Sequence, residues 1–187
     1  MHPSGEDRSF LFLLGSSRLG GNTETLACTA ASYLPGSVKQ NWIRLSEAGL
    51  PPFEDYRHAG LDSWPTPSEP EQRLLDATLE ATDIVLATPT YWYTVSASTK
   101  LYLDYWSGWM RVPGVDFKKR MAGKTLWTVS VLGEEPEQAA ALVDTLQRSA
   151  RYLSMNWGGA LLGNGSKPDD VLRDSAALAG ARTFFGG

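Results

Sequence analysis

The segment 15–23 has the composition of an anion-binding loop. It joins a short apolar run to a segment of helical composition and contains Gly15, Gly20 and Gly21. Glycines let a backbone turn tightly with its amides pointing inward, and the N-terminus of a following helix adds unpaired N–H groups and a positive dipole end. Further polar groups come from Ser16, Ser17, Arg18, Asn22 and Thr23. The segment predicts a phosphate site; the simpler alternative is a polar turn that caps a helix.

The loop departs from three other phosphate-binding motifs. A Walker A motif needs lysine directly after its second glycine, and Gly20 is followed here by Gly21. A dinucleotide fingerprint needs glycine where this chain has Ser17. A tyrosine phosphatase loop needs a cysteine nucleophile within it, and Cys28 lies further on, in the predicted helix. The sequence therefore indicates a site for a monophosphate.

A second loop of interest, 88–94, directly follows an apolar run at 84–87. Pro89 stiffens the turn, and three aromatic residues follow at 91–93. In open α/β sheets ligands lie outside the carboxyl ends of the strands, so we expect this loop to face the same crevice as loop 15–23. An aromatic cluster alone more often indicates packing or an interface. Beside a phosphate site, it indicates a slot for a planar ring.

Strands and helices that would position these loops alternate along the chain. Apolar runs predict five strands, at 10–14, 38–45, 84–87, 126–132 and 158–162. The segments between them predict helices at 23–33, 68–81, 96–109 and 136–153, and a last helix that ends at Ala181. Capping boxes mark two helix starts, Ser68 with Glu71 and Ser166 with Asp169. This alternation predicts an α/β fold with a five-stranded parallel sheet and helices on both faces. We expect one domain, 1–187, with a flexible N-terminus at 1–8.

Composition argues against several classes of function. The 187 residues carry a formal net charge of −4, which disfavours binding to nucleic acid or an anionic membrane. One cysteine allows no intramolecular disulfide, and the first apolar run is too short for a signal peptide or a membrane span. A cytoplasmic location is therefore expected.

Residues for rival chemistries are scarce. The chain has two histidines, His2 and His58, and one cysteine, too few for an ordinary His/Cys metal site. A hydrolase would depend on His58, and the sequence contains no Gly-x-Ser-x-Gly elbow. Acidic residues at 134, 135 and 137 fit a helix start better than a magnesium site. We predict no metal and no catalytic side chain.

Loops 15–23 and 88–94 together resemble two loops of the NAD(P)H-dependent FMN reductases, where FMN is flavin mononucleotide. The pattern Gly-Ser-x-Arg-x-x-Gly-Asn-Thr resembles the family's phosphate loop, and Thr-Pro-Thr-Tyr-Trp with Lys-Leu-Tyr-Leu-Asp behind it resembles its flavin-ring loop and following helix. The related iron–sulfur flavoproteins carry a cysteine cluster that this chain lacks, so no such centre is expected.

The resemblance implies a flavodoxin-like three-layer sandwich and roles for particular residues. It implies that Ser16, Arg18, Asn22 and Thr23 hold the FMN phosphate, and that the isoalloxazine ring lies along Pro89, Thr90, Tyr91 and Trp92. A third family loop, rich in glycine, corresponds here to a segment with one glycine, Gly133.

The implied activity is electron transfer from NAD(P)H through bound FMN to a small oxidised acceptor, such as a quinone, a flavin, or a nitro or azo compound. One alternative is a flavodoxin-type electron carrier, which binds FMN but is reduced by a protein partner. Another is a flavin-binding regulatory protein without turnover.

The predicted helix 96–109 has apolar surface on more than one side, because Leu101 pairs with Tyr105 and Tyr102 with Trp106. The sheet can cover one side. The other side needs a second subunit or the proline-rich segment 46–70, whose length is typical of functional loops but also fits a plain surface excursion. Proteins of the resembling family are usually dimers or tetramers, which favours a homodimer or homotetramer.

Overall fold

The described residues, 8–186 of a computed structural model, form a five-stranded parallel sheet. Its strands are β1 (Ser9–Leu14), β2 (Lys39–Arg44), β3 (Asp83–Ala87), β4 (Thr125–Leu132) and β5 (Asn156–Asn164). Their order across the sheet is β2-β1-β3-β4-β5, and every neighbouring pair is parallel. The predicted α/β class and sheet are confirmed. The chain leaves β1 for β2 on one side and returns to β3 on the other, so the topological switch point lies between β1 and β3.

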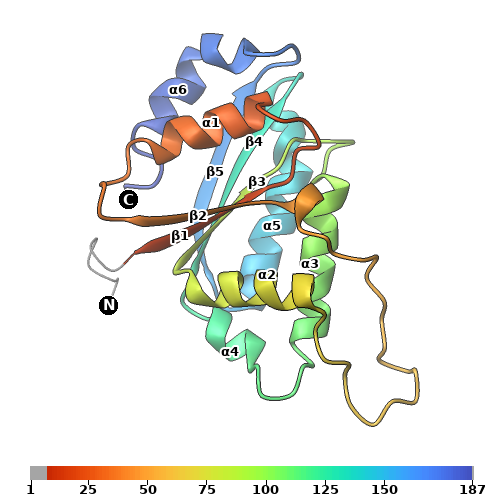
Figure 1. Ribbon diagram of the computed structural model, residues 1–187. Coiled ribbons are helices and arrows are strands. Elements are labelled where there is room, and N and C mark those ends of the chain that lie inside the picture. Colours follow the sequence, from red (N-terminus) through yellow and green to blue (C-terminus); the bar gives the residue numbers. More distant parts are fainter. Residues whose placement is uncertain (1–7, 187) are drawn as a thin grey trace.

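Helices cover both faces of this sheet (Figure 1). They are α1 (Asn22–Ala31), α2 (Glu69–Glu80), α3 (Ala97–Trp109), α4 (Phe117–Met121), α5 (Ala140–Tyr152) and α6 (Ser175–Ala181), with 3₁₀ turns at Leu45–Glu47, Pro136–Ala139 and Asp170–Arg173. Helices α1 and α6 lie on one face, and the other four helices lie on the opposite face. The fold is the expected three-layer sandwich.

Side-chain alternation along β1 divides the core in two. Leu11 and Leu13 pack beneath α2, α3 and α5, while Phe10 and Phe12 pack beneath α1 and α6. All four side chains are almost completely buried. This explains why the run is apolar at every position: each face of the strand has its own hydrophobic layer.

Three details differ from the sequence-based expectations. Helix α4 has no counterpart among the predicted helices. Helix α6 begins at Ser175, where the Asp174 carboxylate accepts the Ala177 N–H at 2.9 Å, so the capping box predicted at Ser166 and Asp169 is wrong. Residues 1–7 of the expected flexible terminus lie outside the described residues. Arg8 is instead held, because its guanidinium pairs with Asp83 at 2.6 Å.

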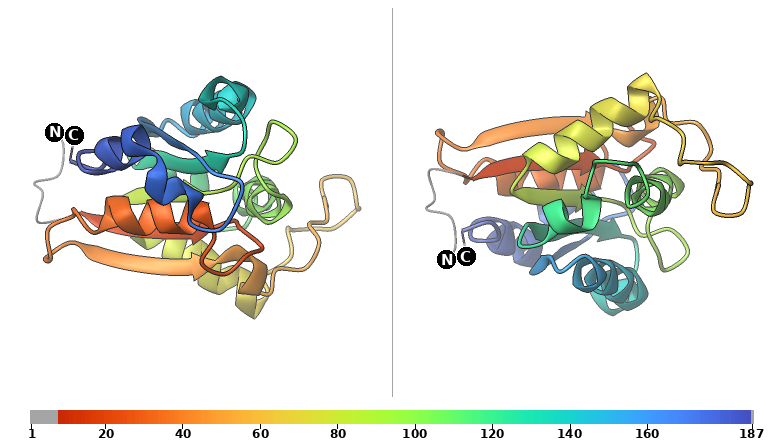
Figure 2. Two further views of the ribbon diagram at one scale, coloured as in Figure 1. Left: turned by 90° about the horizontal axis from the view of Figure 1, so that it is seen from above. Right: turned by 90° about the horizontal axis from the view of Figure 1, so that it is seen from below.

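The segment between β2 and α2 projects from the body as a long loop and also covers part of α3 (Figure 2). The ring of Phe53 meets Tyr105 edge-on at 5.5 Å, and the Tyr105 hydroxyl donates to the Pro51 carbonyl at 3.0 Å. Trp64 lies against Gly108, where a β-carbon would be 3.1 Å from the indole. The chain itself therefore covers the Tyr105 side of α3. Within residues 8–186, none of the helices combines the length and apolar character needed to cross a bilayer.

Candidate functional site

The two loops singled out in the sequence meet at one cavity, beyond the carboxyl ends of β1 and β3. Its volume is about 280 Å³, just below the usual range for ligand and cofactor pockets, ~300–1,000 Å³. Of the nine predicted site residues, all except Trp92 line it: Ser16, Arg18, Asn22, Thr23, Pro89, Thr90, Tyr91 and Gly133. The expectation that the two loops share a crevice is confirmed.

The start of loop 15–23 is fixed by the N-terminus of α3. The Gly15 N–H donates to the Ala87 carbonyl at 2.8 Å, and the Ser98 hydroxyl donates to the Gly15 carbonyl at 3.0 Å. A β-carbon on Gly15 would overlap Thr99 Oγ1 and lie 2.9 Å from Ser96 Oγ. Only glycine therefore lets the first loop residue fit against this cluster of hydroxyls.

The following residues supply an electropositive end to the cavity. Ser16 is buried, and its hydroxyl accepts the Arg18 N–H at 3.1 Å. The Arg18 side chain is exposed and forms no ion pair within the described part of the chain. In α1 the first helical bond runs from Thr25 to Gly21, so the preceding N–H groups have no partner within the helix. The wall combines a cation, hydroxyls and helix-terminal amides.

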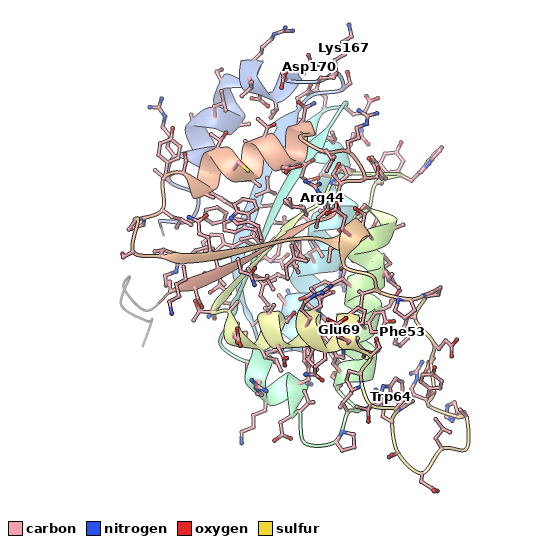
Figure 3. The ribbon with its side chains drawn as sticks, viewed as in Figure 1. Arg44, Phe53, Trp64, Glu69, Lys167 and Asp170 are labelled. Atoms are coloured by element: carbon pink, nitrogen blue, oxygen red, sulfur yellow. The ribbon has the colours of Figure 1, made fainter. Side chains whose placement is uncertain are left out.

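The Asn22 side chain is engaged with a third loop, which follows β5. Its Nδ2 donates to the Lys167 carbonyl at 2.8 Å, and its Oδ1 accepts the Val171 N–H at 3.5 Å. This link brings Gly165, Ser166 and Pro168 into the cavity lining, which the sequence analysis did not anticipate. Figure 3 shows Lys167 and Asp170 at this end of the molecule, above α1. The sheet topology could have indicated this loop in advance, because β5 ends at the same edge of the sheet as β1 and β3.

A partly buried ion pair supports loop 15–23 from outside the cavity. Arg44, the last residue of β2, lies near the start of α1 (Figure 3) and pairs with Glu24 at 2.8 Å. Glu24 also accepts the Gly20 N–H at 2.9 Å. Neither residue was identified from the sequence, since nothing local connects a strand-end arginine with a helical glutamate.

The second loop forms a tight aromatic turn. Tyr91 and Thr94 exchange backbone hydrogen bonds of 2.9 and 3.1 Å, and both central residues have positive φ, 49° at Trp92 and 64° at Tyr93. Such turns favour glycine or asparagine at these positions. Trp92 is 92% exposed and lies outside the cavity lining, whereas Pro89, Thr90 and Tyr91 lie within it.

The cavity lining offers little acid–base chemistry of its own. Among the described residues that line the cavity, only Arg18 and Tyr91 have ionisable side chains, and none is a carboxylate, a histidine or a cysteine. Residues 8–186 also contain no cluster of three metal-ligating side chains. The Thr90 hydroxyl lies in the cavity wall, 2.9 Å from the buried Ser130 hydroxyl behind it. The lining is suited to holding a phosphorylated ligand rather than to proton transfer by the protein.

Comparisons with known proteins agree with this geometry. Residues 9–161 match the family model of the NADPH-dependent FMN reductases. YwqN of Bacillus subtilis (strain 168), named as an NAD(P)H-dependent FMN-containing oxidoreductase, is 32% identical over 169 residues, spanning 89% of this chain and 91% of YwqN.

Solved structures show the same fold. The Trp repressor binding protein from Bacillus subtilis has a TM-score of 0.75 at 27% identity, covering 94% of this chain and 97% of that one. The azoreductase AzrA has a TM-score of 0.63 at 16% identity, with the same coverage. The family match spans most of the sheet and both loops. This chain therefore belongs to the NADPH-dependent FMN reductase family, and it is an oxidoreductase with FMN as its cofactor and NAD(P)H as its electron donor.

Proposed function

We propose that the cavity at the carboxyl edge of the sheet holds FMN, and that the protein passes electrons from NAD(P)H to a small oxidised acceptor such as a quinone, a flavin, or a nitro or azo compound. The observation that carries the proposal is the meeting of loop 15–23 and loop 88–94 in one cavity. One cavity is then lined by a proposed phosphate site and a proposed ring wall, the two parts that an FMN site needs.

The residues of loop 15–23 fit a phosphate dianion. Arg18 supplies a full positive charge, Ser16 and Thr23 supply hydroxyls, and the first turn of α1 supplies amides and the positive end of its dipole. Since both polar atoms of Asn22 already serve the loop after β5, Asn22 contributes to the ligand through its backbone N–H and positions that loop with its side chain.

Pro89, Thr90 and Tyr91 fit the wall beside the isoalloxazine ring. The hydride-transfer and electron-transfer chemistry would be supplied by FMN when it is bound, so the residues of this chain have to bind, orient and shield the reacting molecules. Pro89 and the hydrogen-bonded turn at Tyr91 hold the wall rigid, and the Thr90 hydroxyl, in contact with the buried Ser130 hydroxyl behind it, offers a hydrogen bond to the ring's polar edge. Gly133 lines the same cavity, and Ser166 lies within 4 Å of where its β-carbon would be, so a larger residue there would narrow the site.

The acceptor is proposed to be a small aromatic or quinoid molecule. Tyr91, which lines the cavity, and its neighbours Trp92 and Tyr93 expose 44%, 92% and 56% of their surface, and exposed aromatic surfaces stack with planar rings. Two structural neighbours are named as an azoreductase and an NADPH-quinone reductase, although their low identities show the fold alone.

The deciding experiment is anaerobic reduction of the purified protein. We expect a flavin absorbance spectrum that bleaches rapidly on addition of NADH or NADPH alone, followed by reoxidation with a quinone or azo compound. Initial-rate lines should be parallel if both co-substrates use one face of the ring in turn. A flavin spectrum that bleaches only with a reduced protein partner would support the electron-carrier alternative instead.

A homodimer or homotetramer is proposed as the working assembly. The aromatic turn 91–94 and the tip of the loop between β2 and α2 project on the same side of the molecule (Figure 2), and Leu61 on that loop is 54% exposed. Figure 1 shows the two segments apart along that side, and a second subunit packed against this side would contact both. Light scattering at micromolar concentration should give twice the chain mass or four times, and a monomer mass would refute this assembly.

A further inference from the structure

The ion pair between Glu24 and Arg44 lies where β2 meets loop 15–23. Arg44 is paired in register with Leu14, the last residue of β1, so its side chain starts beside the first residue of the loop. Its Nη2 lies 2.8 and 2.9 Å from the two Glu24 carboxylate oxygens. The side chains are only 13% and 20% exposed, which places this pair among the more buried ones of the described chain.

This pair contacts the loop backbone on both sides of Leu19. The Glu24 Oε2 accepts the N–H of Gly20 at 2.9 Å, and the Arg44 Nη1 donates to the carbonyl of Arg18 at 3.4 Å. Neither charged side chain lines the cavity. A residue that binds the phosphate directly would have to line the cavity. Glu24 and Arg44 contact the loop but do not line the cavity, so their geometry is that of residues that support the loop.

Little else holds the outer part of the loop. Leu19 is 75% exposed, and Gly20 has a φ of +60° with nothing within 4 Å of its β-carbon position. A loop without apolar contacts has to be ordered when a ligand binds, and that ordering weakens affinity. Hydrogen bonds from a mostly buried ion pair can order it beforehand.

We infer that the Glu24–Arg44 pair is a positioning device that fixes the phosphate loop in its binding conformation before FMN arrives. This inference rests on the proposed FMN site and adds two residues that act through Arg18 and Gly20. The competing explanation is that Arg44 attracts the phosphate by charge alone, with Glu24 as a partial quencher of that charge.

Two substitutions separate these explanations. Glu24→Ala removes the contact with Gly20 and leaves Arg44 with the exposed Glu47 carboxylate, 3.5 Å away, as its ion-pair partner. Arg44→Lys keeps the positive charge, but one ammonium group cannot reproduce the separate contacts of Nη2 with Glu24 and of Nη1 with the Arg18 carbonyl. Positioning predicts that each variant raises the dissociation constant of FMN about tenfold, the scale of one charge-assisted hydrogen bond. It also predicts that Glu24→Ala with Arg44→Lys is no weaker than the weaker single variant, because both act on one contact network. Attraction by charge predicts tighter FMN binding for Glu24→Ala and unchanged binding for Arg44→Lys, and that result would overturn the inference.

Riboflavin, which lacks the phosphate, supplies the specific readout. Its dissociation constant should change less than about twofold in all variants, so the ratio of FMN to riboflavin affinity falls; equal losses for both ligands would indicate general damage to the fold and contradict a phosphate-loop role. Asp144→Ala, which removes the carboxylate of the exposed pair with Arg148 on α5, controls for the negative charge lost in Glu24→Ala and should leave both constants unchanged.

Hydrogen exchange of the unaltered apoprotein tests the same inference without any variant, so its outcome does not depend on whether the variants fold. The Gly20 amide should exchange with solvent at least about tenfold more slowly than in an unstructured peptide, because Glu24 holds it. Exchange at the unstructured rate would overturn the inference while leaving FMN binding intact. Failure of the unaltered protein to bind FMN would instead overturn the proposed function, and the inference with it.

Discussion

Replacing Gly15 by alanine tests the packing beneath the proposed phosphate site. The new methyl group would overlap Thr99 Oγ1 and lie 2.9 Å from Ser96 Oγ, so the N-terminus of α3 has to move. Overpacking of this kind costs about 1–3 kcal/mol, and loss of the Ser98 hydrogen bond to the Gly15 carbonyl adds about 1 kcal/mol. We expect the free energy of unfolding to fall by about 2–4 kcal/mol, and the melting temperature by roughly 5–15 °C.

Urea denaturation of the apoprotein, followed by circular dichroism, measures this loss. Gly36→Ala is the matched control: it makes the same chemical change in a turn where nothing lies within 4 Å of the new β-carbon, so its unfolding free energy should stay within about 1 kcal/mol of the parent protein's. Equal midpoints for the two variants would refute the close packing of α3 against Gly15. Since the loop starts at this residue, Gly15→Ala should also weaken FMN binding, and Gly36→Ala should leave it unchanged.

Three further predictions concern charge, backbone strain and pH. Arg18→Ala should weaken FMN binding about tenfold and riboflavin binding hardly at all, measured by fluorescence titration; equal effects would show that the phosphate does not contact Arg18. Tyr93→Gly should relieve the φ of 64° and raise the unfolding free energy by up to about 1 kcal/mol, and a loss of stability would indicate that the exposed ring packs against another surface. Backbone N–H groups, above all that of Ala177, donate hydrogen bonds to the Asp174 carboxylate and hold its pKa below the ordinary value of 3.8. The ionised carboxylate should therefore stabilise the fold above pH 3.8, and this stabilisation should be lost as the pH falls through the lowered pKa of the folded state. Asp174→Ala should therefore destabilise the protein at pH 7 and change nothing in strong acid, which urea midpoints at the two pH values would check.

The sequence alone determined the sheet and the two loops of the cavity. Runs such as 10–14 and 84–87 are apolar at every position because both faces of each strand are buried, and that pattern is local. The glycines of loop 15–23 and the aromatic residues of 91–93 are likewise local signals. Once parallel strands are assumed, both loops have to lie at the same edge.

Tertiary structure decided which side chains support those loops. The pairing of Arg44 with Glu24 depends on the register of β2 against β1, and the link from Asn22 to the loop after β5 joins residues about 145 positions apart. The start of α6 was ambiguous for a related reason, because several aspartates could serve as its cap; Asp170 instead accepts the amides of Ser166 and Lys167, which leaves Asp174 as the cap. Periodicity and motif spacing carry no information about such contacts, since they form only when strand register and loop packing bring distant segments together.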